Sequence, residues 1–296
     1  MTSKAKNPAT SFSRFDLVQR VQHVILIVAF TGLALTGLPQ KFALESWAQA
    51  MIAAMGGIEA IRVIHRVLAT VLMVEVVYHG GEITYKLFVL RLRPTMLPVL
   101  RDLIDLVQKV LYNLRLRQSP PSMGRYNFEE KLEYWALVWG MAIMILTGFL
   151  MWNPISSTRW LSGEFIPAAR IAHGSEAVLA ALAIIVWHMY SVHLRRFNPS
   201  MWTGKLSRHE MQEDHALELE SLESGKAPAP IPPDVLRRRL RVFIPIAVII
   251  SGLLLTGIVW FVTFEQTAIT TVPAYNIQVV PPELETITTP QPTRQP

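Results

Sequence analysis

The sequence predicts an all-α integral membrane protein with five transmembrane helices. Of its 296 residues, 51% are hydrophobic and only 17% are charged. The mean hydropathy is positive, at +0.32. Five apolar runs have about the 20 residues that an α-helix needs to cross a hydrocarbon core of about 30 Å. These runs cover residues 21–38, 61–88, 134–152, 171–194 and 242–264.

The apolar runs divide the chain into segments. A basic N-terminal segment occupies residues 1–20, and the first four spans lie within residues 21–206. Inside that range, residues 90–118 repeat apolar side chains at three- and four-residue spacing, which predicts an amphipathic helix on the membrane surface. The remaining segments are a polar helix with a Pro-rich linker at 207–239, the fifth span at 240–264, and a Thr- and Pro-rich tail at 265–296.

Basic residues gather on one side of the predicted membrane. Of the 28 Lys and Arg residues, 22 fall on this side and six on the other. Loops rich in Lys and Arg stay in the cytoplasm, so we expect a bacterial inner-membrane protein with a cytoplasmic N-terminus and a periplasmic C-terminus. The net charge of +6 follows from this topology and does not indicate a nucleic-acid partner.

The chain contains no cysteine. It therefore cannot ligate an Fe–S cluster through thiolates, form a disulfide, or attach a c-type haem through a C-x-x-C-H motif. Any redox cofactor that it holds must be bound without a covalent link to cysteine.

Four histidines form two long-spaced pairs inside apolar spans. His65 and His79 lie in the second span, and His173 and His188 lie in the fourth. At about 100° and 1.5 Å per residue, each pair lies on roughly one helix face and spans about 21 Å along the axis. Side by side, the two helices would bring His65 to His173 near the outer surface. They would bring His79 to His188 near the inner surface.

This arrangement predicts two haem b groups. Haem iron takes axial ligands from its two faces, whereas zinc requires about four ligands at about 2 Å from one point. No Cys or carboxylate cluster accompanies the four histidines in the sequence. We therefore expect a four-helix haem-binding bundle plus a fifth transmembrane helix, with His65, His173, His79 and His188 as axial ligands.

Several motifs resemble those of a known family. They are Arg14-Phe-Asp-Leu-Val-Gln-Arg-Val-Gln-His23, Ile64-His-Arg66, Glu130-Lys-Leu-Glu-Tyr-Trp-Ala-Leu-Val-Trp-Gly140, Thr147-Gly148, His173-Gly-Ser-Glu-Ala177 and Trp187-His-Met-Tyr190. Over residues 12–222 the chain resembles the cytochrome b subunits of formate dehydrogenases and Ni-Fe hydrogenases. The likeness is greatest to the cytochrome b/b6-domain relatives that accompany multihaem cytochromes.

The resemblance implies a different inner ligand from the one that the spacing favours. It implies that His65 and His173 hold the outer haem, that His23 and His188 hold the inner haem, and that a quinone binds near the inner haem. The spacing favours His79 in place of His23, and only one of the two can complete that haem. A third haem between His23 and His193 is a further possibility that the sequence leaves open.

Three arginines and one glutamate are candidate partners of the cofactors. Arg62, Arg66 and Arg170 lie within about a turn of His65 or His173, where they could pair with haem propionates or anchor the chain at the membrane interface. Glu75 lies one turn before His79, deep in the second span, where a carboxylate is costly. It could hydrogen-bond His79, accept a proton from a quinol, or stay protonated between helices.

Together these features predict a membrane subunit that transfers electrons. We expect electrons to cross between quinone or menaquinone and a periplasmic multihaem cytochrome or Fe–S subunit, beside other membrane subunits of one complex. The sequence lacks a catalytic constellation, so we expect the quinone-reactive part of an oxidoreductase and not an enzyme by itself. Two other classes stay open. One is a haem-free membrane anchor or scaffold, and the other is a transporter that uses intramembrane His and Glu for metal ions or protons.

Overall fold

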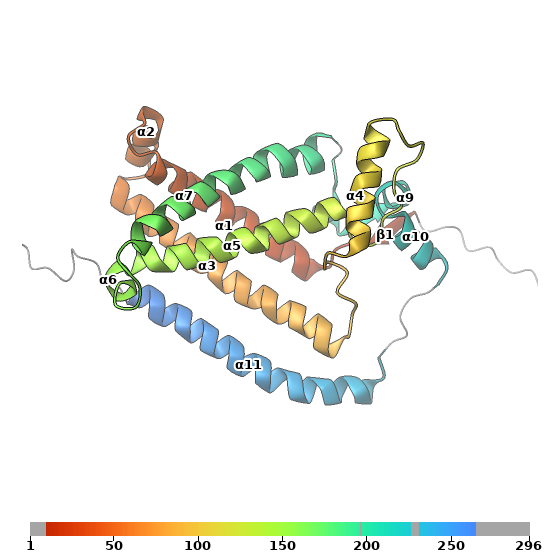
Figure 1. Ribbon diagram of the computed structural model, residues 1–296. Helices are drawn as coiled ribbons and strands as arrows, with labels where there is room; N and C mark the ends of the chain where they lie inside the picture. Colours follow the sequence, from red (N-terminus) through yellow and green to blue (C-terminus); the bar gives the residue numbers. More distant parts are fainter. Residues whose placement is uncertain (1–9, 196, 226–230, 265–296) are drawn as a thin grey trace, which may run out of the picture.

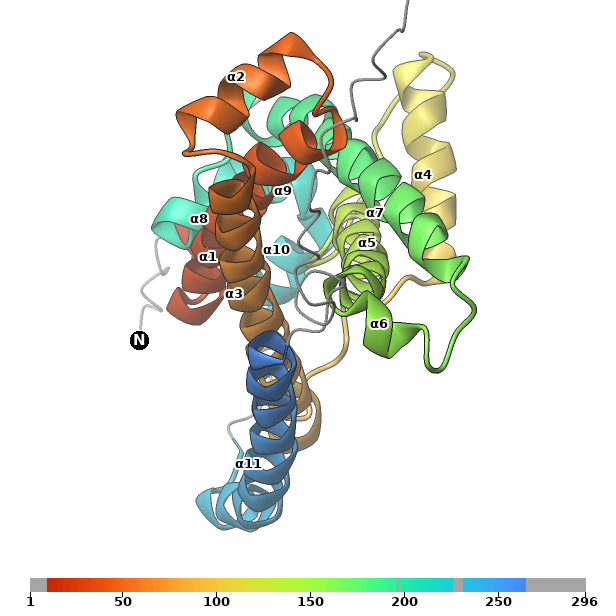
Figure 2. The same ribbon diagram turned by 90° about the vertical axis from the view of Figure 1, so that its left-hand side faces the viewer.

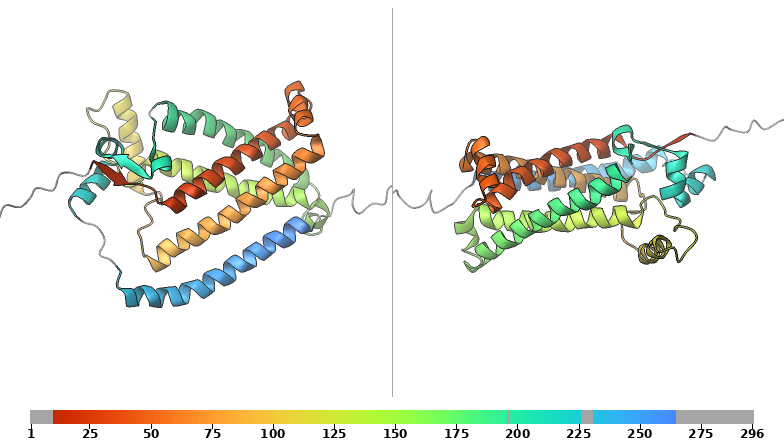
Figure 3. Two further views of the ribbon diagram at one scale, coloured as in Figure 1. Left: turned by 180° about the vertical axis from the view of Figure 1, so that it is seen from behind. Right: turned by 90° about the horizontal axis from the view of Figure 1, so that it is seen from above.

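Four long helices form an elongated bundle in the computed structural model, which describes residues 10–195, 197–225 and 231–264 (Figure 1). The bundle consists of α1 (Leu17–Lys41), α3 (Ile58–Thr84), α5 (Phe128–Trp152) and α7 (Phe165–Leu182). Helix α1 packs on α3, α5 packs on α7, and α1 also contacts α7. Seen from above, the α1–α3 pair and the α5–α7 pair form two layers (Figure 3).

The first helix of each pair begins at a side-chain cap. The Asp16 carboxylate accepts a hydrogen bond from the backbone N–H of Gln19, and the side-chain oxygen of Gln19 accepts one from the backbone N–H of Asp16. Asn127 and Glu130 make the same reciprocal pair at the start of α5. A capping box satisfies N–H groups that the first helical turn leaves without a partner. The sequence thus fixes the point at which each helix leaves the surface.

Four helices are long and apolar enough to cross a membrane within the described part of the chain. They are α1, α5, α7 with its continuation to Leu194, and α11 (Pro233–Thr263). Helix α3 has 27 residues, about 40 Å of helix, and runs alongside α1, although it carries five charged residues. Most side chains on the outer faces are apolar and exposed, among them Leu146, Ile171 and Leu179. These findings confirm the predicted all-α membrane fold.

Wider turns extend two of the bundle helices. A π-helical turn, η1 (Tyr85–Val89), follows α3, and two more, η2 (Ala183–His188) and η3 (Tyr190–Leu194), continue α7. A π-turn accommodates one more residue than an α-turn and shifts the helix face that follows it. The turn η2 therefore changes the direction in which His188 points.

Helix α11 stands outside the four-helix bundle, against α3 and η1 (Figure 2). The ring of Phe243 lies 5.8 Å from that of Tyr85, and the guanidinium of Arg239 donates a 2.7 Å hydrogen bond to the carbonyl of Val89. The helix begins at Pro233, earlier than the sequence boundary at residue 240 suggested. Pro at the first helical position is favourable because its missing N–H is not needed there.

Small elements close one end of the bundle, which we name the capped end (Figure 1). A two-stranded antiparallel sheet of β1 (Ser11–Ser13) and β2 (Lys205–Ser207) joins α8 (Ser200–Thr203), α9 (Arg208–Asp214) and α10 (Ala216–Glu223). Leu206, Met211 and Leu219 form the buried centre of this cap, and Phe12 packs against it. Arg14 ties the cap to α5 through a 2.9 Å ion pair with Glu130.

Helix α4 (Leu100–Asn113) lies across the capped end, seen nearly end-on in the view from above (Figure 3). Lys131 holds it to α5 through a 2.8 Å ion pair with Asp102. Its other side is apolar and exposed, with Leu100, Leu103 and Val107 among the outward residues. Helices α2 (Ser46–Ala54) and α6 (Pro154–Ser157) lie at the opposite end, which we name the α2 end. Residues 265–296, the predicted tail, fall outside the described residues.

Candidate haem-binding site

Two histidines face each other between helices α3 and α7, namely His65 and His173. Their ring centres lie 6.4 Å apart at an angle of 63°. A metal–imidazole bond is about 2 Å, and a nitrogen lies about 1.1 Å from the centre of a five-membered ring with bonds of about 1.33 Å. Two imidazoles on opposite sides of one metal are therefore about 6 Å apart, centre to centre. The spacing of His65 and His173 fits a bis-histidine haem.

Two threonines fix the proton on these rings. The hydroxyl of Thr36 donates its proton to the carbonyl of Gly32 at 2.7 Å and lies 2.9 Å from Nδ1 of His65. A hydroxyl has one proton to donate, so Thr36 accepts the hydrogen bond from the Nδ1–H. Thr147 does the same for His173, at 2.9 Å, while donating to the carbonyl of Ile143. Both rings consequently present an unprotonated Nε2, the form that ligates a metal.

Glycines stand beside both rings. A Cβ at Gly37 would lie 3.0 Å from Cε1 of His65, and one at Gly148 would lie 3.6 Å from Cε1 of His173. The first distance is too close for a normal contact and the second is an ordinary one. The Thr-Gly pairs of α1 and α5 therefore supply both the hydrogen-bond acceptor and the room for each imidazole.

A second pair of facing histidines lies nearer the capped end. The ring centre of His23, in α1, is 6.4 Å from that of His188, in η2, at an angle of 47°. Nδ1 of His188 lies 3.0 Å from a carboxylate oxygen of Glu133 and donates its proton to it, since a carboxylate only accepts. This pair has the same centre-to-centre distance as His65 and His173, so the same spacing argument applies to it.

His79 does not face His188. Its Nδ1 lies 2.7 Å from Oε1 of Gln22, its Nε2 lies 3.2 Å from the hydroxyl of Tyr134, and its ring packs 6.0 Å from that of Tyr134. The long spacing of His65 and His79 placed both on one face of α3, but it did not say which helix that face meets. At this level Tyr134 of α5 bonds His79 of α3, whereas His23 of α1 faces His188 of η2. The structure therefore brings His23, and not His79, opposite His188.

The two helix pairs repeat one pattern that the sequence alone did not reveal. Thr36-Gly37 corresponds to Thr147-Gly148, and 14 residues earlier Gln22 corresponds to Glu133. Each threonine bonds the first histidine of the helix that follows, Thr36 with His65 and Thr147 with His173. Gln22 bonds the second histidine of its following helix, His79, and Glu133 bonds His188. In this comparison His23 corresponds to Tyr134. The signal was the repeated Leu-Thr-Gly, which is short enough to pass unnoticed among apolar residues.

His193 packs against His188. Their ring centres lie 6.3 Å apart, nearly perpendicular at 82°, and Phe197 covers the other side of His193 at 5.9 Å. The suggested third haem would require His23 as its second ligand, and His23 already faces His188. A third haem on His23 and His193 would therefore have to share His23 with the His23–His188 pair.

The candidate propionate partners differ in their surroundings. Arg62 is partly exposed and forms a 3.0 Å ion pair with Glu59, and Arg66 lies 5.0 Å from the ring centre of Trp152. Arg170 is exposed, one turn before His173. The sequence analysis did not single out Lys41, at the end of α1. Its side chain crosses over Gly174, where a Cβ would lie 3.0 Å from Nζ. A glycine next to a candidate ligand and opposite a basic residue was the available signal.

Glu75 is not the hydrogen-bond partner of His79, because Gln22 and Tyr134 occupy both ring nitrogens. Gln22 in turn donates a short hydrogen bond from Nε2 to Glu82. The carboxylate that reaches His79 through Gln22 is therefore Glu82, one turn after His79 in the same helix. Glu75 lies on the same side of α3 as His79, one turn before that histidine.

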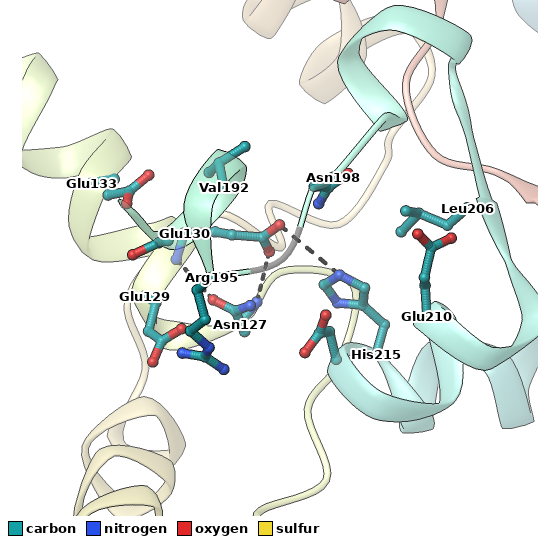
Figure 4. A pocket seen from close by; sticks show the side chains of 12 residues that line it. Asn127, Glu129, Glu130, Glu133, Val192, Arg195, Asn198, Leu206, Glu210 and His215 are labelled. Atoms are coloured by element: carbon teal, nitrogen blue, oxygen red, sulfur yellow. Dashed lines mark hydrogen bonds and ion pairs between the residues drawn. The ribbon is translucent and has the colours of Figure 1, made fainter. Parts of the chain in front are cut away.

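A polar cavity of about 180 Å³ opens between α5, the end of α7 and the cap (Figure 4). The carboxylates on its wall include Glu133, the partner of His188. His215 closes it from the side of the cap, where Nδ1–H donates to the carbonyl of Gly124 at 3.0 Å. Burial lowers the pKa of His215 below its usual value. The other lining residues include Asn127, Glu129, Glu130, Arg195, Asn198, Glu210 and Asp214.

A helical membrane bundle that pairs histidines across its interior, each ring held by a neighbouring side chain, defines the class of b-type membrane cytochromes. A family model described as prokaryotic cytochrome b561 matches residues 14–204. The chain belongs to this family, within the cytochrome b superfamily of formate dehydrogenase and Ni-Fe hydrogenase subunits.

Curated relatives agree with this assignment. The chain is 20% identical over 218 residues to the cytochrome b556(Fdn) subunit of the nitrate-inducible formate dehydrogenase of Escherichia coli strain K12. That match covers 72% of this chain and 93% of the relative. It is 23% identical over 187 residues to the cytochrome b556(fdo) subunit of a formate dehydrogenase from the same strain, covering 60% of this chain and 77% of the relative. The protein is thus an electron-transport membrane cytochrome with haem b as its family's cofactor.

Family membership leaves no support for a haem-free scaffold. Over residues 10–195, 197–225 and 231–264, no group of three or more His, Cys, Asp or Glu side chains is arranged to hold a metal ion.

Proposed function

We propose that the chain holds two haem b groups, an outer one between His65 and His173 and an inner one between His23 and His188. The observation that carries this proposal is the 6.4 Å distance between ring centres in both pairs. Haem supplies one-electron redox chemistry. The histidines of the chain would hold two such carriers at two depths, because His23 lies 13 residues, about 20 Å of helix, before Thr36, the partner of His65.

The cavity at the capped end is the place that we propose for a quinone head group. Its wall includes Glu133, which bonds the ligand His188, so a molecule there would lie next to the inner site. Asn127 and Arg195 offer hydrogen-bond donors to quinone oxygens, and the surrounding carboxylates can exchange protons with water. The amphipathic helix α4 lies at this same end of the bundle (Figure 1), and His23 faces His188, whose partner Glu133 lines the cavity.

We propose that the capped end faces the cytoplasm and the α2 end the periplasm. Of the 22 basic residues on the predicted cytoplasmic side, 18 fall in described segments, and those segments lie at the capped end, in keeping with the positive-inside rule. The exposed apolar side of α4 would then rest on the inner leaflet. Arg62, Arg66, Arg170 and Lys41 lie toward the α2 end, near the outer histidine pair, where they would pair with haem propionates.

The matched relatives are subunits of formate dehydrogenases. By analogy we propose that this chain is the quinone-reactive membrane subunit of a larger oxidoreductase and carries electrons between quinone or menaquinone and a periplasmic subunit. The absence of cysteine means that an Fe–S cluster or c-type haem would belong to that partner. A periplasmic multihaem cytochrome or an Fe–S subunit docked at the α2 end would lie next to the outer pair.

The test is a haem count on the purified protein with single ligand variants. We expect about two haems per chain in the wild type and loss of about one in His173→Gln and in His23→Gln. His193→Gln serves as the matched control and keeps both. One haem in the wild type, or two in His23→Gln, would overturn the assignment. Reduction of the haems by a menaquinol analogue, slowed in Asn127→Ala, tests the quinone site separately.

A further inference from the structure

The polar cluster around His79, toward the end of α3, has no role in ligating the two proposed haems. It consists of His79, Gln22, Tyr134, Glu82 and Lys86. Polar and ionisable side chains within a membrane are costly, and they commonly mark proton or ion pathways. Five of them in contact across α1, α3, η1 and α5 therefore require an explanation.

The cluster lies in the same layer as the inner histidine pair. Gln22, which bonds His79, is the chain neighbour of His23. Tyr134, which also bonds His79, is the chain neighbour of Glu133, the partner of His188. Two adjacent pairs of residues thus connect His79 with both proposed ligands of the inner haem, although His79 is in hydrogen-bond contact with neither.

The hydrogen bonds leave His79 as a neutral proton acceptor. The amide nitrogen of Gln22 donates to Glu82, so its oxygen faces His79 and accepts the Nδ1–H. Nε2 is then unprotonated and accepts from the hydroxyl of Tyr134. A phenol can rotate its hydroxyl proton away, which frees Nε2 to bind a proton.

A carboxylate and a route to solvent complete the arrangement. The Glu82 carboxylate lies 3.9 Å from Nδ1 and would stabilise a histidinium. Glu82 also forms a short ion pair with Lys86, which reaches Asp16 at 3.5 Å. Asp16 is exposed at the start of α1, at the capped end. A chain of charged groups thus leads from His79 to that surface.

We propose that His79 is a proton-binding site coupled to reduction of the inner haem. This inference rests on the proposed His23–His188 ligation. One electron entering the inner site adds a negative charge in a medium of low dielectric constant, which favours a positive charge nearby. One proton from water at the capped end binds Nε2 of His79 at the same time, and it is released when the electron leaves. The net charge of the layer is unchanged.

Other titratable groups surround this layer and must be separated from His79. Helix α3 contributes Glu75 and Glu82, and η1 contributes Lys86. Helix α5 contributes Tyr134 and Glu133, and α1 contributes Asp16. The histidines of the layer are His23, His188 and His193. The experiment therefore replaces His79 and two of the carboxylates one at a time.

The measurement is a redox titration of the purified protein with dithionite and mediators between about pH 5.5 and 8.5. In the wild type, we expect the midpoint potential of the inner haem to fall as the pH rises, by up to about 59 mV per pH unit, the value for one proton per electron. His79→Gln keeps groups that can bond Gln22 and Tyr134 but cannot be protonated, so its profile becomes flat. Glu82→Gln moves the sloping region to lower pH, because the histidinium loses its anionic partner.

Glu75→Gln is the matched control, since it removes one carboxyl near the layer that bonds neither proposed ligand, and it keeps the slope. A wild type without slope overturns the proposal, and so does a slope that survives in His79→Gln or disappears only in a carboxylate control. Loss of the inner haem from His79→Gln also overturns it, because His79 would then be a ligand. Failure of the haem assignment alone is seen separately, as retention of both haems in His23→Gln.

Discussion

The hydroxyl of Thr36 offers a sharp test of how the outer haem is held. In Thr36→Val the side chain keeps its shape and loses the acceptor for the Nδ1–H of His65. A buried donor without a partner costs about 1–3 kcal/mol. Since each 1.4 kcal/mol corresponds to a factor of ten, we expect haem affinity at this site to fall about 5- to 150-fold. That range agrees with the roughly 10- to 100-fold loss typical of changes behind a metal-bound histidine.

The assay follows transfer of haem from the purified protein to an excess of a haem-binding apoprotein. Thr36→Ser is the control, because it retains the hydroxyl that accepts from His65. Thr147→Val should weaken the same haem through His173, because the repeated geometry gives it an equal 2.9 Å contact. Haem transfer at the wild-type rate from both valine variants would show that the threonine hydroxyls do not hold His65 and His173. It would also contradict the assignment of the proton to Nδ1 of these two rings.

Three further results are expected. Gly37→Ala should lower outer-haem occupancy, because its Cβ would lie 3.0 Å from Cε1 of His65, whose ring Thr36 holds by a hydrogen bond, whereas Gly148→Ala at 3.6 Å should leave the haem content unchanged. Glu133→Gln should raise the midpoint potential of the inner haem by tens of millivolts in a redox titration at pH 7, since removal of an anion beside His188 favours the added electron; a fall would contradict this. Burial lowers the pKa of His215 from 6.5, so the folded protein favours the neutral imidazole. The free energy that this contributes to folding is fully present above about pH 6.5 and is lost as the pH falls below that value. Limited proteolysis of the cap should accordingly be faster at about pH 5.5 than at about pH 7.5, and a difference equally large in His215→Asn would assign it to another group.

The all-α membrane fold and the positions of its helices could be predicted from the sequence because they depend on local properties. A run of apolar residues of the required length specifies a membrane helix in any context. The predicted spans lie within the observed helices, except that the fifth span extends one residue beyond Thr263. Most helices begin several residues before the apolar runs, because capping residues such as Asp16 and Asn127 are polar. The geometry at His65 and His173 also agreed with the expectation, since each is the upper histidine of its helix and the two helices face each other there.

The inner pair could not be derived in the same way. Periodicity places His79 and His65 on one face of α3, but a face has no partner until the helices pack. The π-turn η2 also shifts His188 relative to its position in an uninterrupted α-helix. The residue types of Ala183–His188 do not predict this wider turn. The family resemblance pointed to His23, and the spacing pointed to His79. The tertiary arrangement of the helices placed His23 opposite His188.

The sequence by itself determined which runs form the long apolar helices and that the histidines lie at two levels along them, because these follow from composition and helical period along one dimension. Only the tertiary structure decided which imidazoles face each other and which side chains bond their outer nitrogens. Such contacts join residues far apart in the chain, for example Thr36 with His65 and Glu133 with His188. They depend on how neighbouring helices rotate and cross, which the pattern within any one helix does not specify.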